Sequence, residues 1–402
     1  MNQTRDAYMN VGGFYKLSNI VQDYPWGSRT SIPELFGIEN QNNQPMAEIW
    51  MGAHPKASSS ITFNGESRSL NVLIEIYAEA MLGSKTYQEY AELPYLLKVL
   101  AAEKALSIQV HPTKEEASAG FEMENKKGID INAFDRNYKD ANHKPELVYA
   151  LTPFLAMNGF RPYDQIVDLF TAIRCPVLQQ QIDSFSGDRT ESGLSQLFSG
   201  ILHLNNQVKD DVLLALLAWA RESDDSLAAL VLELNELYPN DIGLLAPLML
   251  NVIQLSPGQA MFLHAGTPHA YLKGTAIEIM ANSDNVLRAG LTPKYIDVPE
   301  LVNRCNFKAM NPEKIFTAPI IRGSEQQFPV PVGDFSFSVY SEPSQSFVEV
   351  TRAEIWFAID SDVRFEDRNG NCLVINKGES VFIPYATQSF SVTSLGRVAR
   401  AF

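Results

Sequence analysis

The chain has 402 residues, of which 45% are hydrophobic and 20% charged, and it carries a formal net charge of −15. This composition is that of an ordinary globular protein, and the length predicts two or three domains. No apolar run reaches the roughly 18 residues of a membrane span, and the negative charge argues against nucleic acid or an anionic membrane as the main partner.

The N-terminal segment and the cysteines bear on location. The opening stretch MNQTRDAYMNVGGFYKL has no basic start followed by an apolar core, so it does not indicate a secretory signal. The three cysteines (Cys175, Cys305 and Cys372) are too far apart in sequence for a disulfide framework or a metal-ligand pattern. We therefore expect a cytoplasmic protein whose cysteines are small buried hydrophobic residues with reduced thiols.

The first part of the chain mixes strand, helix and turn signals. Residues 1–60 are rich in strand and turn patterns, and residues 68–91 repeat apolar side chains at offsets of three and four, which predicts a helix. The stretch 95–111 predicts two strands around a turn at 102–104. Thr113, followed by Lys-Glu-Glu, is a typical helix start.

Residues 163–249 have a different character. Segments such as VKDDVLLALLAWARES and SLAALVLELNELY place apolar residues at i, i+3, i+4 and i+7, which is the pattern of amphipathic helices. Several helices joined by short polar loops fit this length. The pattern predicts a helical domain inserted between strand-rich parts.

After the helical segment the chain returns to strands and turns. Short apolar runs at 259–264, 269–272 and 275–281 are separated by turn residues, including Lys-Gly at 273–274, and predict a β-meander or half of a small barrel. From residue 301 onward the pattern is again strand and turn.

One internal comparison suggests a duplication. Residues 255–271 align with residues 375–391 at a shift of 120, and the glycines at 258 and 378 coincide. The histidine at 269 meets Ser389, however. The comparison predicts a second, structural copy of the same β unit that lacks the histidines.

Four side chains are candidate metal ligands. Gln109 and His111 are two apart on a predicted strand and so share a face. Glu146 opens another predicted strand, and His269 begins the run at 269–272. Imidazole, carboxylate and amide donors suit zinc best, with iron and other divalent ions open. The structural alternative is a core histidine beside a surface glutamate.

Basic residues occur on the same segments as these candidates. They are Lys98, Lys144, Arg288 and Lys294. A chain of net charge −15 needs a local excess of basic groups to bind an anion, and these four would supply it. Scattered solvated side chains on loops are the alternative.

At these residues the sequence closely resembles the type I mannose-6-phosphate isomerases (phosphomannose isomerases), which are zinc-dependent cupin enzymes. The resemblance rests on long, specific motifs spread over most of the first 300 residues. These are YPWG from Tyr24, AEIWMGAHPK from Ala47, LSIQVHP from Leu106, NYKDANHKPEL from Asn137 and PHAYLKGTAIEIMANSDNVLRAGLTPKYIDVPEL from Pro268.

The resemblance implies a mainly β fold with an α-helical insert. Residues 1–160 together with 250–308 are expected to form a catalytic cupin (β-jelly-roll) domain, and residues 161–249 a helical domain. Residues 309–402 are expected to form a C-terminal cupin-like β-barrel domain without metal ligands. We expect a monomer whose partners are small sugar phosphates.

The implied reaction is the interconversion of mannose 6-phosphate and fructose 6-phosphate through a cis-enediol intermediate. The resemblance assigns one Zn²⁺ per chain to Gln109, His111, Glu146 and His269. It places Arg288 beside the reacting carbons, and our candidates for the proton-transfer pair are Lys144 and Asp284. The expected substrate contacts are Ser107, Lys98, Tyr271, Glu278 and Lys294, with the phosphate received by Ser107, Lys98 and Lys294.

Two other classes of function remain open from the sequence. A non-haem iron cupin oxygenase also uses histidine and carboxylate, but it prefers two histidines and one carboxylate, which leaves Gln109 unexplained. A sugar-phosphate-binding protein without activity would keep the site and show binding without turnover. Within the proton-transfer pair, burial and a nearby metal would let Lys144 act as the base, and Glu278, Tyr271 or a zinc-bound hydroxide are the alternatives to this pair.

Overall fold

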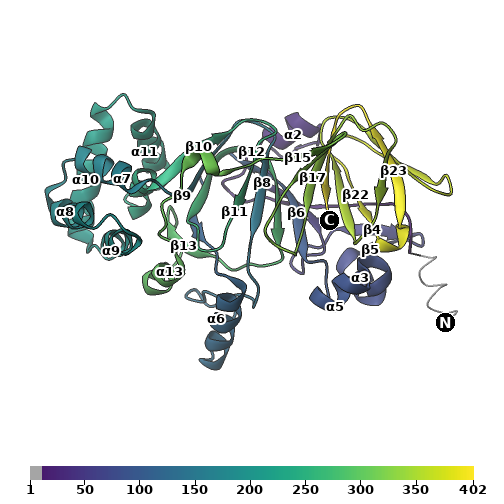
Figure 1. The fold of residues 1–402 in the computed structure, drawn as a ribbon, viewed down its shortest axis with the longest axis horizontal. Coiled ribbons are helices and arrows are strands. Elements are labelled where there is room, and N and C mark those ends of the chain that lie inside the picture. Colours follow the sequence, from purple (N-terminus) through teal and green to yellow (C-terminus); the bar gives the residue numbers. More distant parts are fainter. Residues whose placement is uncertain (1–10) are drawn as a thin grey trace.

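The computed structural model describes residues 11–402, which form three parts along the longest axis (Figure 1). Helices lie at one end, a large sheet lies in the middle, and the C-terminal strands lie at the other end. None of the helices in residues 11–402 is long and apolar enough to cross a membrane.

The central part is built on an eleven-stranded sheet whose main path runs β14-β11-β8-β12-β6-β3-β2. Strands β6 and β8 are buried along their whole length because packed side chains cover both faces. The strands of this sheet are β2 (Ile20–Gln22), β3 (Glu48–Gly52), β6 (Tyr95–Ala102), β7 (Ile108–Val110), β8 (Glu146–Ala150), β9 (Phe154–Phe160), β10 (Leu250–Leu255), β11 (Ala260–Leu263), β12 (His269–Ala281), β13 (Leu287–Gly290) and β14 (Phe316–Thr317).

Strand β12 connects the two halves of this sheet. Its first residues pair with β7 and β9, and its later residues pair with β6 and β8. The predicted turn at 273–274 is wrong, because the chain continues as one strand with a register shift between Tyr271 and Lys273. Gly274 permits this bulge: its φ is +118°, and a Cβ there would lie 2.4 Å from the Pro153 carbonyl oxygen.

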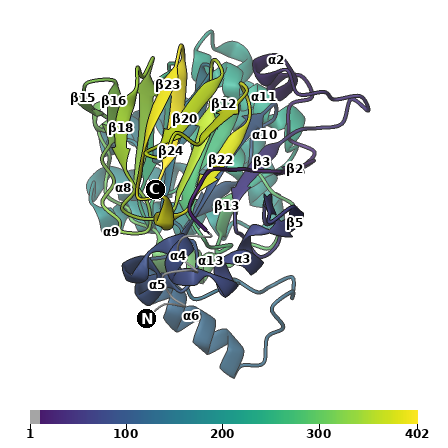
Figure 2. The same cartoon turned by 90° about the vertical axis from the view of Figure 1, so that its right-hand side faces the viewer.

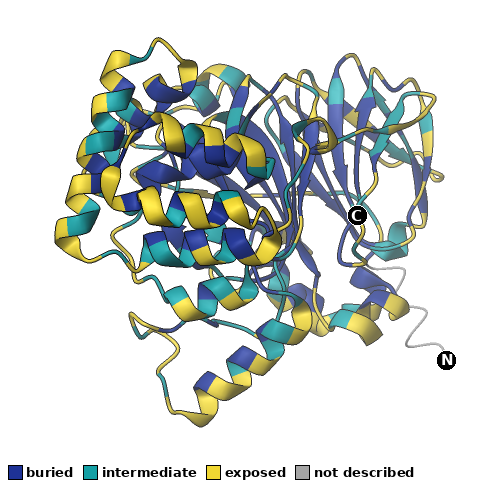
Figure 3. Ribbon diagram, turned by 60° about the vertical axis from the view of Figure 1, so that its left-hand side comes forward, coloured by how far each residue is buried: buried dark blue, intermediate teal, exposed yellow. Residues whose placement is uncertain are grey.

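The predicted helical segment is helical in the structure. Each of its helices has a buried inner side and an exposed outer side, as Figure 3 shows, and the buried residues form one apolar cluster. Three of the α-helices are capped at their N-terminus by a side chain that accepts a hydrogen bond from a backbone N–H. The capping residues are Thr190, Asn205 and Asp225. The elements are α7 (Tyr163–Ala172), η1 (Pro176–Leu178), α8 (Gln179–Gly187), α9 (Glu191–Leu202), α10 (Asn206–Glu222), α11 (Ser226–Leu237), η2 (Ile242–Leu245) and α12 (Ala246–Met249).

Shorter helices and one hairpin surround the central sheet. The predicted helix over 68–91 is three short helices, interrupted at Tyr77 and Gly83. The predicted start at Thr113 is confirmed, since Thr113 and Glu116 form a reciprocal capping box. The elements are α2 (Ser31–Phe36), β4 (Ser60–Phe63), β5 (Glu66–Ser69), α3 (Leu70–Ile76), α4 (Ala78–Leu82), α5 (Ser84–Tyr90), α6 (Lys114–Lys126) and α13 (Val298–Arg304).

The C-terminal strands form two sheets that enclose a core around Trp356, and they face the viewer in Figure 2. Their pairing among residues 11–402 closes no barrel. One sheet contains β1 (Tyr15–Lys16), β15 (Ile320–Arg322), β16 (Glu325–Phe328), β17 (Phe337–Ser341), β19 (Glu354–Ala358), β22 (Ser380–Ile383) and β24 (Arg397–Ala401). The other contains β18 (Ser346–Glu349), β20 (Val363–Asp367), β21 (Cys372–Ile375) and β23 (Ser389–Ser394), and η3 (Pro312–Lys314) and η4 (Tyr385–Thr387) lie in the connections.

The C-terminal part is packed firmly on the central sheet. One apolar cluster contains residues of both, and the buried Tyr95 hydroxyl donates to the carbonyl oxygens of Ala353 and Ala401. The cysteines are free, but the expectation that all are buried is wrong. Cys372 is exposed on β21, and Cys305 is half-buried and packs against the apolar cluster that includes the helical segment.

Candidate active site

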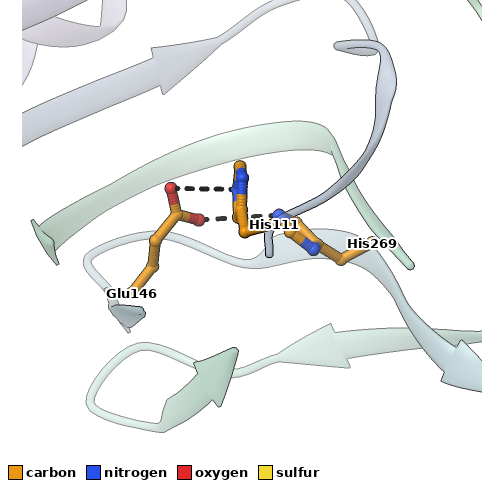
Figure 4. A group of neighbouring side chains, drawn as sticks. All are labelled: His111, Glu146 and His269. Atoms are coloured by element: carbon orange, nitrogen blue, oxygen red, sulfur yellow. Dashed lines mark ion pairs between the residues drawn. The ribbon is translucent and has the colours of Figure 1, made fainter. Parts of the chain in front are cut away.

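Three of the predicted metal ligands converge inside the central sheet (Figure 4). The Nε2 atoms of His111 and His269 each lie 3.5 Å from one oxygen of Glu146. All three side chains are buried, and their possible ligand atoms lie within 4.8 Å of one another. The sheet produces this convergence because Glu146 starts β8, His269 starts β12 and His111 follows β7.

The histidine rings are held so that one nitrogen of each faces Glu146. The Nδ1 of His111 donates to the carbonyl oxygen of Asn285 at 2.7 Å, and the Nδ1 of His269 donates to that of Thr267 at 2.9 Å. Backbone acceptors of this kind fix the tautomer of a metal-binding histidine. Burial lowers the pKa of His111 to about 4, so the ring is neutral near pH 7.

This geometry fits a divalent metal ion. The buried Nε2 of His111 has no hydrogen-bond partner, which is costly unless another group binds it. Two neutral imidazoles and one carboxylate form a donor set that zinc accepts. Gln109 is the direct cross-strand neighbour of His269 on β7, and its Nε2 lies 3.4 Å from the Ser107 hydroxyl.

A cleft of about 390 Å³ lies beside this cluster, and a smaller hollow of about 60 Å³ shares several of its lining residues. All of the predicted site residues except His111 line one or both of these cavities. The predicted residues in their walls are Lys98, Ser107, Gln109, Lys144, Glu146, His269, Tyr271, Glu278, Asp284, Arg288 and Lys294.

The two predicted proton-transfer residues have different partners. The ammonium group of Lys144 lies 3.1 Å from Glu146 and is largely buried. Asp284 pairs with Lys56 at 2.7 Å and has His54 at 3.9 Å. Burial favours the neutral acid, but Lys56 and His54 prevail and hold the pKa of Asp284 below its usual value. Asp284 is therefore ionised at neutral pH.

Lys98 belongs to a buried polar network. Its ammonium group lies 2.8 Å from Glu278 and 3.6 Å from Glu48. The Tyr271 hydroxyl donates to Glu278 at 2.7 Å and lies 3.1 Å from Glu146. Burial opposes the charge of Lys98, yet the two carboxylates raise the pKa of this lysine above its ordinary value. The network thus links Lys98 to a candidate metal ligand.

Arg288 and Lys294 also line the cleft and provide positive charge there. Neither has a carboxylate within 4 Å among residues 11–402, in contrast to Lys98 and Lys144. Burial lowers the pKa of both groups, and the charge of Arg288 lowers that of Lys294 further. An anion entering the cleft would meet these two cations without displacing an existing partner.

Sequence reasoning missed several residues of the cleft. His54 lines the cleft and packs edge-on against Trp50. Lys56 was not singled out, although it pairs with Asp284. Both residues follow β3 in the turn at the end of AEIWMGAHPK, so strand alternation could not have placed them in the cleft. Asn285 does not line the cleft, but its carbonyl oxygen orients His111 and it was also missed; its amide donates to the carbonyl oxygens of Asp140 and Asn142 at 2.8 Å each.

Comparisons with known proteins agree with this site. Residues 14–163 match the family model "phosphomannose isomerase type I, catalytic domain", and residues 174–250 match "phosphomannose isomerase type I, helical insertion domain". The mannose-6-phosphate isomerase of Salmonella typhimurium is 47% identical over 96% of this chain and 99% of its own length. The Homo sapiens enzyme is 37% identical over 73% of each chain.

Solved structures give the same result. A zinc-bound mannose 6-phosphate isomerase superimposes with a TM-score of 0.92 at 46% identity, covering 97% of this chain and 99% of its own. A mutant of the Salmonella typhimurium phosphomannose isomerase gives a TM-score of 0.93 at 47% identity, with the same coverage. Identity of this level over nearly the whole chain shows that the protein belongs to the type I phosphomannose isomerase family.

Proposed function

We propose that this protein catalyses the reversible isomerisation of mannose 6-phosphate and fructose 6-phosphate with the help of one zinc ion. The observation that carries the proposal is the buried cluster of His111, Glu146 and His269 beside a cleft lined by Arg288 and Lys294, neither of which has a carboxylate within 4 Å in the described part of the chain. Family membership gives the reaction, and the site contains the groups that this reaction needs.

The ligands we propose for zinc are Gln109, His111, Glu146 and His269. The three charged or aromatic members are already assembled, and Gln109 lies directly across from His269. When bound, zinc supplies a positive charge that polarises the oxygens of the open-chain sugar. The Tyr271 hydroxyl holds one oxygen of Glu146, so the orientation of that carboxylate depends on the Lys98–Glu278 pair behind it.

We propose that the cations divide two tasks. Arg288 lies on β13 opposite Gln109, which places it next to the ligand strand, where it offsets the charge that develops on the enediolate. Lys294 and Ser107 receive the phosphate. Lys98 lines the same cleft, but two carboxylates already neutralise it, so its main contribution is to hold Glu278 in place.

Proton transfer is proposed for Lys144 and Asp284. Aldose–ketose exchange removes the proton on C2, returns a proton to C1, and moves one between the two oxygens, so the net composition does not change. Asp284 is ionised and able to accept a proton, and the ammonium group of Lys144 is a donor beside Glu146. Near-normal activity of both Lys144→Ala and Asp284→Asn would refute this pair.

We also propose that the protein acts in the cytoplasm as a monomer. A phosphorylated sugar is a charged cytoplasmic metabolite, and the three cysteines are free thiols. The domain division that we propose is 1–160 with 250–308, 161–249 and 309–402, with one cupin-type β unit in the middle of the molecule and the other at the end opposite the helices.

The decisive experiment is an assay of fructose 6-phosphate formation from mannose 6-phosphate. The protein is measured as purified, after chelator treatment, and after zinc is added back. Loss and recovery of activity would support both the reaction and the metal. An inactive protein with a full equivalent of zinc bound would refute the isomerase assignment.

A further inference from the structure

A second cavity, of about 470 Å³, borders β9, β11 and β14 of the central sheet. Its floor is formed by residues 158–159 at the end of β9 and by Thr267 just before β12. Its walls come from residues 306–317, the segment that leads from α13 to the C-terminal strands. None of the residues that line it is acidic, although the chain carries a net charge of −15.

The cavity has basic side chains at its entrance. Lys308 and Lys314 both line it and are exposed, and neither has a carboxylate within 4 Å among residues 11–402. The imidazole of His264 is on the same rim. A pair of cations without counter-ions, in a concave site that lacks carboxylates, favours an anionic ligand.

The floor contains an unused hydrogen-bond acceptor. Asn158 is 1% exposed, and its side-chain oxygen has no hydrogen-bond partner. A buried polar atom of this kind costs free energy unless a ligand or water satisfies it. The rest of the floor is fixed: Asn251 donates to the Asn158 carbonyl oxygen, and the Gly159 N–H donates to Pro268. A ligand hydroxyl is the group that would complete this acceptor.

We propose that this cavity is a second binding site, for a small polyhydroxylated anion that carries a phosphate or carboxylate group. The anionic group lies between Lys308 and Lys314, and a hydroxyl group donates to Asn158. Such a ligand would also affect the metal cluster. Thr267, in the floor, accepts the hydrogen bond that orients His269, and Asn158 is the cross-strand neighbour of His269. The site is therefore a candidate for control of turnover.

The test compares three zinc-loaded, full-length proteins by calorimetric titration. They are the wild type, the variant Lys308→Gln/Lys314→Gln, and the control Lys85→Gln/Lys127→Gln, which removes the same charge from exposed lysines elsewhere. The probes are inorganic phosphate, gluconate and gluconate 6-phosphate, so that the two anionic groups are distinguished. Binding in the catalytic cleft is common to all three proteins and cancels in the comparison.

We expect one or more probes to bind the wild type and the control about tenfold more tightly than the Lys308/Lys314 variant, or with an additional site. Identical isotherms for the three proteins would overturn the proposal. The link to His269 is tested by kcat at saturating substrate with the bound probe present. A kcat that changes in the wild type and control, but not in the variant, supports the link; an unchanged kcat overturns it.

Discussion

Replacing Lys98 with methionine decides between two roles for this residue. If Lys98 mainly binds the substrate phosphate, Lys98→Met should raise KM and leave the fold intact. In the structure, however, its ammonium group is 2.8 Å from Glu278 and 3.6 Å from Glu48, and the three side chains are only 3% to 8% exposed. The substitution therefore leaves two buried carboxylates without their cation.

The expected cost is large. Removing one partner of a buried ion pair typically costs about 3–5 kcal/mol, because the remaining charge is neither solvated nor paired. We predict a loss of this size in the free energy of unfolding of Lys98→Met. Glu278→Gln removes one of the two carboxylates, so the double variant Lys98→Met/Glu278→Gln should be more stable than the sum of the single effects, by about 0.5–3 kcal/mol.

The assay is chemical denaturation of all four proteins at one fixed concentration of free zinc, with kcat and KM measured on the same samples. The matched control is Lys104→Met, which removes an exposed lysine just beyond the end of the same strand. If Lys98→Met unfolds like the wild type and only KM changes, the structural reasoning is refuted and the phosphate role stands.

Three further predictions concern the metal, a histidine and the phosphate. Tyr271→Phe removes the hydroxyl that holds Glu146 and Glu278, so zinc affinity, measured by competition with a chromogenic chelator, should fall about 10–100-fold; unchanged affinity would contradict the network. In zinc-free protein, burial lowers the pKa of His111 from its unfolded value of 6.5 to about 4. The folded state therefore keeps its full stability above pH 6.5, where His111 is neutral in both the folded and the unfolded chain. Stability should fall by about 1.4 kcal/mol per pH unit as the pH drops below 6.5 towards 4, and His111→Gln should lose this component. Lys294→Gln should raise KM for mannose 6-phosphate far more than it lowers kcat; an equal effect on both would place Lys294 at the reacting atoms instead.

Local structure could be predicted from the sequence where a single short segment determines it. The capping box at Thr113 forms as expected, because all of its groups lie within four residues. The helical insert follows from the 3.6-residue period of its apolar side chains. The convergence of His111, Glu146 and His269 was not fixed by spacing, and it was the resemblance to a family that selected these residues together with Gln109.

Contacts between side chains that are far apart in the chain could not be predicted from the sequence. Lys98 was assigned to the phosphate because it is basic, but its environment depends on the register between β6 and β12, which places it directly opposite Glu278. Asp284 and Lys56 meet across a comparable distance in the chain. Gly274 followed a lysine in a typical turn pattern, yet the sheet uses its positive φ for a bulge inside one strand.

The strand registers agree with the alignment of residues 255–271 on residues 375–391. The shift of 120 residues equates Leu263 with Ile383, and these lie opposite Glu146 and Glu354 in their respective sheets. Glu354 therefore has the place of the candidate metal ligand Glu146. In the C-terminal copy the guanidinium group of Arg400 lies 2.5 Å from Glu354, and Trp356 donates to the same carboxylate at 2.7 Å.

The C-terminal β unit thus has a buried carboxylate at the matching position, but a different cation neutralises it. Ser389, which replaces the histidine at 269 in the alignment, is 1% exposed and its hydroxyl has no hydrogen-bond partner. An uncompensated carboxylate at Glu354 would be strongly destabilising in this core, and a fixed guanidinium removes that cost without a metal ion. The same β unit therefore supports a metal centre in one half of the molecule, where imidazoles accompany the carboxylate, and a permanent ion pair in the other, where they do not.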